Sequence, residues 1–259
     1  MKKIALTLTM ILAFSLGANA QFGKLNKKHL DAVKKTAQAL TISDEDMANY
    51  VQEYVDWVDK HNVLCSTTDE NPKSKAYADR LEKIKADIVM PEGMKLDIKV
   101  FYVVDQNAFA CANGSIRLMA GLMDMLTDDE ILGVIGHEIG HIANKDTKNA
   151  FKKALMTSAL KDVVASTSET VASLTDSQLG ALGEALAGAQ FSQKAEYAAD
   201  DYGYELLKKC GKDSGAMASA LRKIQQLQDD SNIDRSKVKQ LFSTHPESGK
   251  RAARLEKKG

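Results

Sequence analysis

The chain has 259 residues, of which 44% are hydrophobic and 27% are charged, values typical of a globular protein long enough for one or two domains. This composition excludes a disordered tail, a collagen and a membrane protein with many spans. Lysine plus arginine and aspartate plus glutamate both number 35, so the overall charge does not favour a nucleic-acid partner. With only three prolines, the sequence favours a mostly helical protein.

The first twenty residues are typical of an export signal. Lys2 and Lys3 give a positive start, residues 4–16 are mainly apolar, and Ala18-Asn19-Ala20 has the pattern of a signal-peptidase site. We expect cleavage before Gln21 and a mature protein in the periplasm of a Gram-negative bacterium, or secreted; a short membrane anchor or a buried terminal helix is the alternative. Because residue 21 is Gln and not Cys, a lipid anchor is not predicted. No later stretch is apolar enough to predict a transmembrane segment in the mature chain.

The next part of the chain is predicted to be helical. Residues 24–40, 43–60 and 75–88 each form a candidate helix, and in 43–60 the apolar residues recur at three- and four-residue steps. Ser43 followed by three acidic residues is a favourable helix start. We interpret residues 21–70 as a helical N-terminal extension and residues 71–259 as the main domain.

The pattern then changes to that of strands. Apolar residues alternate over 96–104, and residues 108–112 and 115–119 are short extended runs joined by Asn113-Gly114, a strong hairpin signal. Thr127 and Glu130 fit a capping box that starts the next helix, and residues 145–259 are predicted to be helical. The expected fold is therefore α+β and mostly helical, with a small antiparallel sheet packed on that capped helix.

The capped helix carries the segment most informative about chemistry. His137 and His141 are four residues apart, so on a helix both imidazoles reach one ion. Glu138 lies beside the first of them and is placed to take a proton from a water whose pKa zinc has lowered. The spacing predicts a zinc site with a carboxylate base.

A catalytic zinc needs a third protein ligand and one open position. The metzincin arrangement is excluded because Asn144 and Thr147 stand where it needs Gly and His. The remaining histidines are His29, His61 and His245, and a carboxylate from a later helix is the other option. Glu196 and Asp200, four residues apart, offer such a carboxylate together with a partner for the far N–H of a ligand histidine, or else form a solvated acidic face.

Taken together, these motifs resemble the M48 family of zinc metallopeptidases, which are gluzincins, and within it the soluble envelope members of Gram-negative bacteria. The resemblance runs from about Ala76 to near the C-terminus. It rests on four segments, which are Asn107–Ala110 with Asn113–Arg117 and Gly121–Met123, then His137–His141, then Phe191–Asp200, and finally Ser243–Pro246 with Arg251. Family members often have Arg where this chain has Gln193, so one local salt bridge of the family is not expected here.

The resemblance implies a role for each matching residue. His137, His141 and Glu196 would bind one Zn²⁺ per chain, and Glu138 would act as general base and then as general acid. Asp200 would orient a ligand histidine, with His137 the expected partner. His245 would stabilise the oxyanion; as an alternative it is a loop histidine before a proline.

The resemblance also implies how substrate binds. The strand Ser115-Ile116-Arg117-Leu118 is expected to be an edge along which an extended polypeptide lies. The implied substrates are internal peptide bonds of unfolded or damaged envelope proteins. The alternative from another class is a zinc-stabilised, chaperone-like module that binds such proteins without cutting them.

The three cysteines add little to these interpretations. Cys65, Cys111 and Cys210 allow three pairings in an oxidising compartment, and the sequence does not choose among them. Oligomeric state and cleavage preference have no signal in the sequence.

Overall fold

The computed structural model describes residues 42–156, 173–230, 234, 236 and 238–258. The predicted export signal and the predicted helix over 24–40 lie outside these residues. Within the described part of the chain, no helix is both long enough and apolar enough to cross a membrane. The boundary between an N-terminal extension and a main domain stays a prediction.

The N-terminal half contains three helices and all three strands of the described chain. The predicted helices over 43–60 and 75–88 are present with shifted ends, and Ser43 and Asn71 cap them with side chains that accept backbone N–H bonds. The elements in chain order are α3 (Asp44–His61), α4 (Pro72–Ala86), β1 (Asp97–Phe101), β2 (Ala108–Ala110), β3 (Ser115–Met119) and α5 (Ala120–Met125).

The C-terminal half is helical wherever it is regular, as predicted. The Thr127–Glu130 capping box is present at the start of α6, and Gly211, with a positive φ, follows the end of α10. The elements are α6 (Asp128–Ala143), α7 (Asp146–Leu155), α9 (Asp176–Ala187), α10 (Gln193–Lys209), α11 (Gly215–Asp229), α12 (Lys239–Thr244) and α13 (Ser248–Glu256).

The sheet is mixed, and this corrects the prediction of an antiparallel one. Strand order is β1-β3-β2; the hairpin strands β2 and β3 are antiparallel as expected, but β1 pairs in parallel with β3, Ile98 opposite Ile116. After β1 the chain passes to the far edge before the hairpin returns β3 to the centre. Gly114 makes that return possible, because its φ is +92° and an added Cβ would lie 1.9 Å from the Lys95 carbonyl oxygen.

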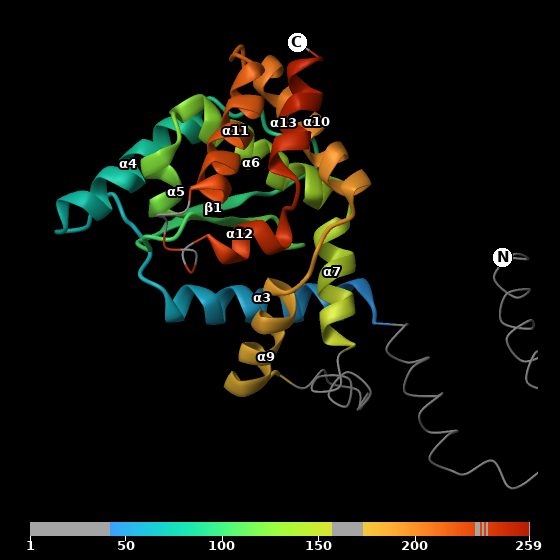
Figure 1. Cartoon of the computed structure of the whole chain (residues 1–259). Coiled ribbons are helices and arrows are strands. Elements are labelled where there is room, and N and C mark those ends of the chain that lie inside the picture. The colour runs from blue at the N-terminus through green and yellow to red at the C-terminus, as the bar shows by residue number, and fades with distance from the viewer. Residues whose placement is uncertain (1–41, 157–172, 231–233, 235, 237, 259) are drawn as a thin grey trace, which may run out of the picture.

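Two hydrophobic cores cover the two faces of this sheet. The first joins Ile98, Ile116 and Leu118 to the helices α4, α6, α10, α11 and α13. The second joins Phe101 and Cys111 to α3, α7 and α9. Figure 1 shows the same division, with α11 and α13 on one side of the strands and α3 and α9 on the other. The helix α6, which carries the histidine pair, belongs to the first core.

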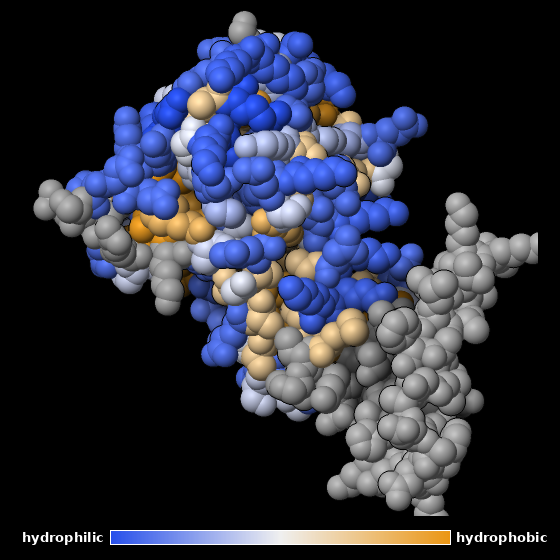
Figure 2. Space-filling model, turned by 45° about the vertical axis from the view of Figure 1, so that its right-hand side comes forward, coloured by the Kyte–Doolittle hydropathy of each residue, from blue (hydrophilic) through white to orange (hydrophobic). Residues whose placement is uncertain are grey.

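The outer surface is mostly hydrophilic on the face shown in Figure 2, where apolar residues form smaller patches. Among the described residues, the large apolar side chains with most exposure are Val63, Val89, Met90, Tyr102 and Val104. All three cysteines are free thiols, so no predicted pairing is formed in this structure. Cys111 is buried, and burial raises the pKa of its thiol to about 12.

Candidate metal centre

The helix α6 holds His137, Glu138 and His141 in a buried position. Its N-terminus is fixed by the capping box, in which Glu130 Oε2 accepts from Thr127 N at 2.7 Å. Glu130 also accepts bonds from Ser219 and Lys223 of α11, so the same carboxylate ties the helix start to its neighbour. The three site residues are at most 4% exposed. The predicted pentapeptide therefore lies on a rigid, well-capped helix.

The helix α10 packs unusually close to α6 because both present small residues. An added Cβ on Gly136 would lie 2.8 Å from Gly203 Cα, and one on Gly140 would lie 2.8 Å from Ala199 Cα. Contacts this short exist only where no Cβ is present. This seam of small residues brings Glu196 and Asp200, both on α10, against the two histidines of α6.

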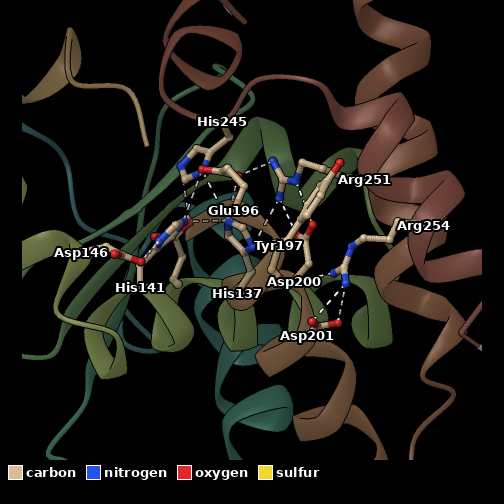
Figure 3. Close-up of polar contacts among 11 residues, drawn as sticks. His137, His141, Asp146, Glu196, Tyr197, Asp200, Asp201, His245, Arg251 and Arg254 are labelled. Atoms are coloured by element: carbon tan, nitrogen blue, oxygen red, sulfur yellow. Dashed lines mark hydrogen bonds and ion pairs between the residues drawn. The ribbon is translucent and has the colours of Figure 1, made fainter. Parts of the chain in front are cut away.

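The predicted ligand atoms converge on one point. His137 Nε2 and His141 Nε2 lie 3.1 Å apart, His137 Nε2 lies 3.7 Å from Glu196 Oε2, and His141 Nε2 lies 3.6 Å from Glu196 Oε1. Two atoms bound to one tetrahedral zinc at ~2.1 Å lie roughly 3.4 Å apart, so these spacings fit such an ion. The side chains that could hold a metal are therefore those predicted, and His245 lies with them, all four ligand atoms being within 4.8 Å of one another (Figure 3).

Two carboxylates set the orientation of the histidine rings. Asp200 Oδ1 lies 3.0 Å from His137 Nδ1, and Asp146 Oδ2 lies 3.0 Å from His141 Nδ1. Protons on both Nδ1 atoms leave both Nε2 atoms as lone-pair donors that face each other. Two lone pairs at 3.1 Å repel unless a proton or a metal ion lies between them. This arrangement of two facing lone-pair donors is the observation that shows the residues present fit a metal ion.

The charge of the site also favours a cation. Glu138, Glu196 and Asp200 are at most 3% exposed, and Arg251 is the buried guanidinium beside them. In the metal-free protein a proton supplies part of the missing charge, because Asp146 and Glu196 outweigh the effect of burial and raise the pKa of His141 to about 9. Burial and the neighbouring His141 lower the pKa of His137. Binding of a divalent ion would displace the proton from His141.

Arg251 connects the ligand carboxylate to its supporting carboxylate. Its Nη1 lies 2.5 Å from Glu196 Oε2, while its Nε donates to Asp200 Oδ2 at 2.9 Å. Burial alone would raise the pKa of Asp200, but Arg251 and His137 lower it to about 2. Arg251 comes from α13, so the last helix of the chain fixes two acidic residues of α10.

Comparison with known proteins agrees with this geometry. Residues 75–258 match the peptidase family M48. The chain belongs to peptidase family M48. It is 36% identical over 219 residues to metalloprotease LoiP of Escherichia coli K12, an alignment that covers 84% of this chain and 82% of LoiP. It is 33% identical to metalloprotease YcaL of the same organism, with the same coverage, and 28% identical over 215 residues to a protease HtpX homolog of Salinibacter ruber, covering 72% and 74% of the two chains. The protein is a metallopeptidase and acts on polypeptides.

His245 of this M48 peptidase lies closer to the ligand atoms than its predicted oxyanion role requires. Its Nδ1 is 3.3 Å from His137 Nε2 and 3.2 Å from Glu196 Oε1, and its Nε2 is 3.7 Å from Glu138 Oε1. His245 therefore has the geometry of a fourth ligand as well as of a neighbour of the base. The ring of Phe191 stacks on His141 with centroids 4.1 Å apart.

Other predicted residues lie elsewhere. His61 is exposed at the end of α3, where its Nδ1 donates to the Trp57 carbonyl, and His29 lies outside the described residues. The prediction that Ser115–Leu118 forms a sheet edge is wrong: β3 is the central strand, and these four residues are buried. Its backbone is already paired on both sides. Within the described part of the chain, the strand beside α6 whose outer edge is free is β2 (Ala108–Ala110).

Sequence reasoning missed Asp146 and gave Arg251 no role. Asp146 follows His141 by five residues and is the first residue of α7, after Lys145 turns the chain with a φ of +62°. An acidic residue directly after a metal-binding helix could have been recognised as a partner for its second histidine. Arg251 carries no such local signal, because only the tertiary fold brings α13 to α10.

Proposed function

We propose that this M48 peptidase is a zinc endopeptidase with one Zn²⁺ per chain, held by His137, His141 and Glu196. The observation that carries the proposal is the convergence of two imidazole nitrogens and one carboxylate beside Glu138. Two histidines and one glutamate form a donor set typical of catalytic zinc in proteases. When bound, the metal would polarise the scissile carbonyl and lower the pKa of the attacking water.

The side chains of this protein would move the proton and hold the charge. Glu138 would take the proton from the attacking water and deliver it to the leaving amine. His245 would donate to the oxygen that becomes negative in the transition state. Asp200 and Asp146 would keep both ligand rings in the tautomer that turns Nε2 toward the site, and Arg251 would hold Glu196 and Asp200 in place.

We propose β2 as the strand that holds an extended substrate. Its outer side is free in the described sheet, and it packs beside α6. Asn107, directly before β2, is 3% exposed, and neither polar atom of its amide has a hydrogen-bond partner among the described residues. An amide offers one acceptor and two donors, which match the N–H and C=O of a substrate peptide group. Backbone pairing of this kind selects extended chains.

Selection of extended chains supports the proposed substrate class, which is unfolded or damaged envelope protein. The proposed location follows from the sequence of residues 1–21 alone, which predicts export to the periplasm of a Gram-negative bacterium. Cell fractionation with an antibody against the protein tests the location, and an N-terminus at Gln21 in the mature protein tests the signal cleavage. The same selection of extended chains also supports the second candidate, a zinc-stabilised module that binds without cutting.

One substitution separates the two candidates. Glu138→Gln keeps the size and hydrogen-bonding shape of the side chain but removes the base, so zinc should stay bound while cleavage of unfolded casein falls by about 10²–10⁴-fold. Glu205→Gln, an exposed change on α10, is the matched control and should cleave normally. If zinc-loaded wild type cleaves no protein yet keeps aggregation-prone proteins soluble, the binding module is correct and the peptidase mechanism is not.

A further inference from the structure

Three exposed apolar side chains gather where the chain passes from β1 to β2. Val63 is 65% exposed, Tyr102 is 37% exposed and Val104 is 66% exposed, and they are three of the five large apolar residues with most exposure in the described part of the chain. Tyr102 N donates to the Val63 carbonyl at 2.7 Å, and Val104 follows Tyr102 by two residues. These three residues therefore form one surface, which we call the apolar ridge.

The backbone of the apolar ridge is held firmly against its neighbours. The ring of Tyr102 lies beside that of Tyr77 on α4, with centroids 6.2 Å apart, and the Tyr77 hydroxyl donates to a carboxylate of α5 at 2.7 Å. Gly121 of α5 lies directly against Val104, since an added Cβ on this glycine would be 2.0 Å from the Val104 carbonyl oxygen. A surface with a fixed shape loses little conformational entropy when a ligand binds to it.

The apolar ridge continues the cleft beside the proposed base. Leu122, the residue after Gly121, lines a cavity together with Ala108 of β2 and Glu138 of α6. The adjacent residues Gly121 and Leu122 thus connect the ridge to this cavity. Val104 precedes Ala108 by four residues, so their Cα atoms are at most ~14 Å apart, a distance that an extended peptide spans with about four residues. A substrate that is paired with β2 and continues past the start of this strand therefore reaches the ridge.

The chemistry of the apolar ridge suits apolar side chains of a polypeptide. Valine side chains offer no hydrogen-bonding groups, and covering them with another apolar side chain removes both surfaces from water. In a folded protein many large apolar side chains are buried, whereas an unfolded chain exposes them. Pairing with β2 recognises only the backbone, so the ridge adds recognition of apolar sequence at a distance from the bond that is cut.

We propose that the apolar ridge is an exosite of the peptidase, which binds an apolar stretch of the polypeptide substrate about four to six residues away from the part paired with β2. This inference rests on the proposed endopeptidase function, since it concerns the substrate of that site. The peptidase then selects chains that are both extended, as β2 requires, and locally apolar. Folded proteins rarely offer both features together, which limits their binding.

The test measures binding separately from cleavage. Two fluorescein-labelled peptides of sixteen residues share one sequence except at one end, which is Leu-Val-Phe-Leu in the first and Ser-Gly-Ser-Gly in the second. A second pair carries these tetrapeptides at the opposite end, so that both directions of the substrate along β2 are tested. All four are titrated by fluorescence polarisation against the zinc-loaded Glu138→Gln protein. In one of the two pairs the apolar peptide should bind at least about 10-fold more tightly, and equal binding in both pairs would overturn the proposal.

Matched double variants in the Glu138→Gln background locate the binding surface. Val63→Ser with Val104→Ser should bring the two affinities to within about 3-fold of each other, because the apolar contact is lost. Val89→Ser with Met90→Ser changes two side chains of similar exposure that follow α4, outside the ridge, and should keep the preference. A preference unchanged by the ridge variant, or lost equally in both variants, would overturn the proposal.

Sedimentation velocity without peptide tests the other occupant of such a surface, a second copy of the chain. The Glu138→Gln protein and its ridge variant should sediment alike. A dimer that the ridge variant dissociates would show that a second copy covers the ridge, and would overturn the exosite.

The protein with Glu138 intact separates this inference from the proposed function. If it cleaves casein while the peptides bind without preference, the endopeptidase stands and the exosite fails. If the apolar preference is present and is lost in the ridge variant but no peptide or protein is cut, the exosite stands as a binding surface and the endopeptidase fails.

Discussion

Asp146 Oδ2 accepts a hydrogen bond from His141 Nδ1 at 3.0 Å, and this pair matches the contact between Asp200 and His137 on the neighbouring ligand. Each histidine of α6 therefore has its own carboxylate, one from α7 and one from α10. The two contacts together turn both Nε2 atoms toward the same point.

Asp146→Asn should weaken metal binding. The amide can still accept a bond but has no charge, so it holds the His141 tautomer less firmly, and zinc affinity should fall by about 10–100-fold. Competition with a chromogenic chelator measures this affinity. The control is Asp44→Asn on α3, which removes the exposed ion-pair partner of Lys148; Lys148 lies on α7, as Asp146 does. This control should not change zinc affinity. Equal affinities in both variants would show that Asp146 does not support the ligand.

Gly136→Ala should separate α6 from α10. The new Cβ would lie 2.8 Å from Gly203 Cα, and overpacking of this kind costs about 1–3 kcal/mol, more than the ~1 kcal/mol that Ala gains over Gly in a helix. Urea denaturation should show lower stability, and zinc affinity should fall because Glu196 moves with α10. Gly180→Ala on α9, whose Cβ would meet its nearest atom at 4.0 Å, should not destabilise the protein.

Arg117→Met should destabilise the protein in a pH-dependent way. It leaves Asp59 and Asp97 without their guanidinium, and breaking a buried pair costs roughly 3–5 kcal/mol, less here because Asp97 is half exposed. Burial alone would raise the pKa of Asp97, but Arg117 lowers it. The stabilisation is thus present above the ordinary carboxyl pKa and is lost as pH falls through the lowered value.

Urea denaturation of the metal-free protein and the variant at pH 7 and pH 3 measures this effect. The gap in the free energy of unfolding between them should be smaller at pH 3, because the stabilisation that comes from the lowered pKa of Asp97 declines once the pH falls below the ordinary carboxyl pKa. A gap that grows at low pH would contradict the assignment of the Arg117 ion pairs as the cause.

His245→Ala tests the proposed oxyanion role. Loss of one such donor should lower kcat by about 10²–10³-fold while zinc content and KM stay near wild type. Casein-peptide kinetics with parallel metal analysis provide both readouts. Higher activity, or loss of bound metal, would show instead that His245 acts mainly as a ligand.

The local parts of the fold could be predicted from the sequence, whereas contacts made across the fold could not. The capped helix, the hairpin turn and the spacing of His137 and His141 follow from patterns within a few residues. Glu196 and Asp200 can also be predicted as a pair, because they are four residues apart, the same spacing as His137 and His141, and so share one face of a helix. The contacts of Arg251 and the buried position of Asn107 depend on tertiary neighbours, and no local pattern in the sequence predicts them.

The family resemblance implied that Ser115–Leu118 is a sheet edge, and the surroundings of Arg117 show why this strand lies inside the sheet. Alternation of Ser115 and Arg117 with Ile116 and Leu118 is typical of a strand with one face in water. Here the polar face is buried under α3, and Asp59 of α3 and Asp97 of β1 neutralise the guanidinium. A charged residue on a strand therefore marked a buried ion pair at the centre of the sheet and not an edge.

Metal content of the Glu196→Gln variant tests the central claim most directly. Plasma mass spectrometry after exhaustive dialysis should find one zinc per chain in wild type and in the Glu205→Gln control, and far less than one in Glu196→Gln. Casein cleavage should be lost with the metal and return when zinc is added to wild type. Full zinc occupancy in Glu196→Gln, or unchanged cleavage by demetallated wild type, would contradict the account.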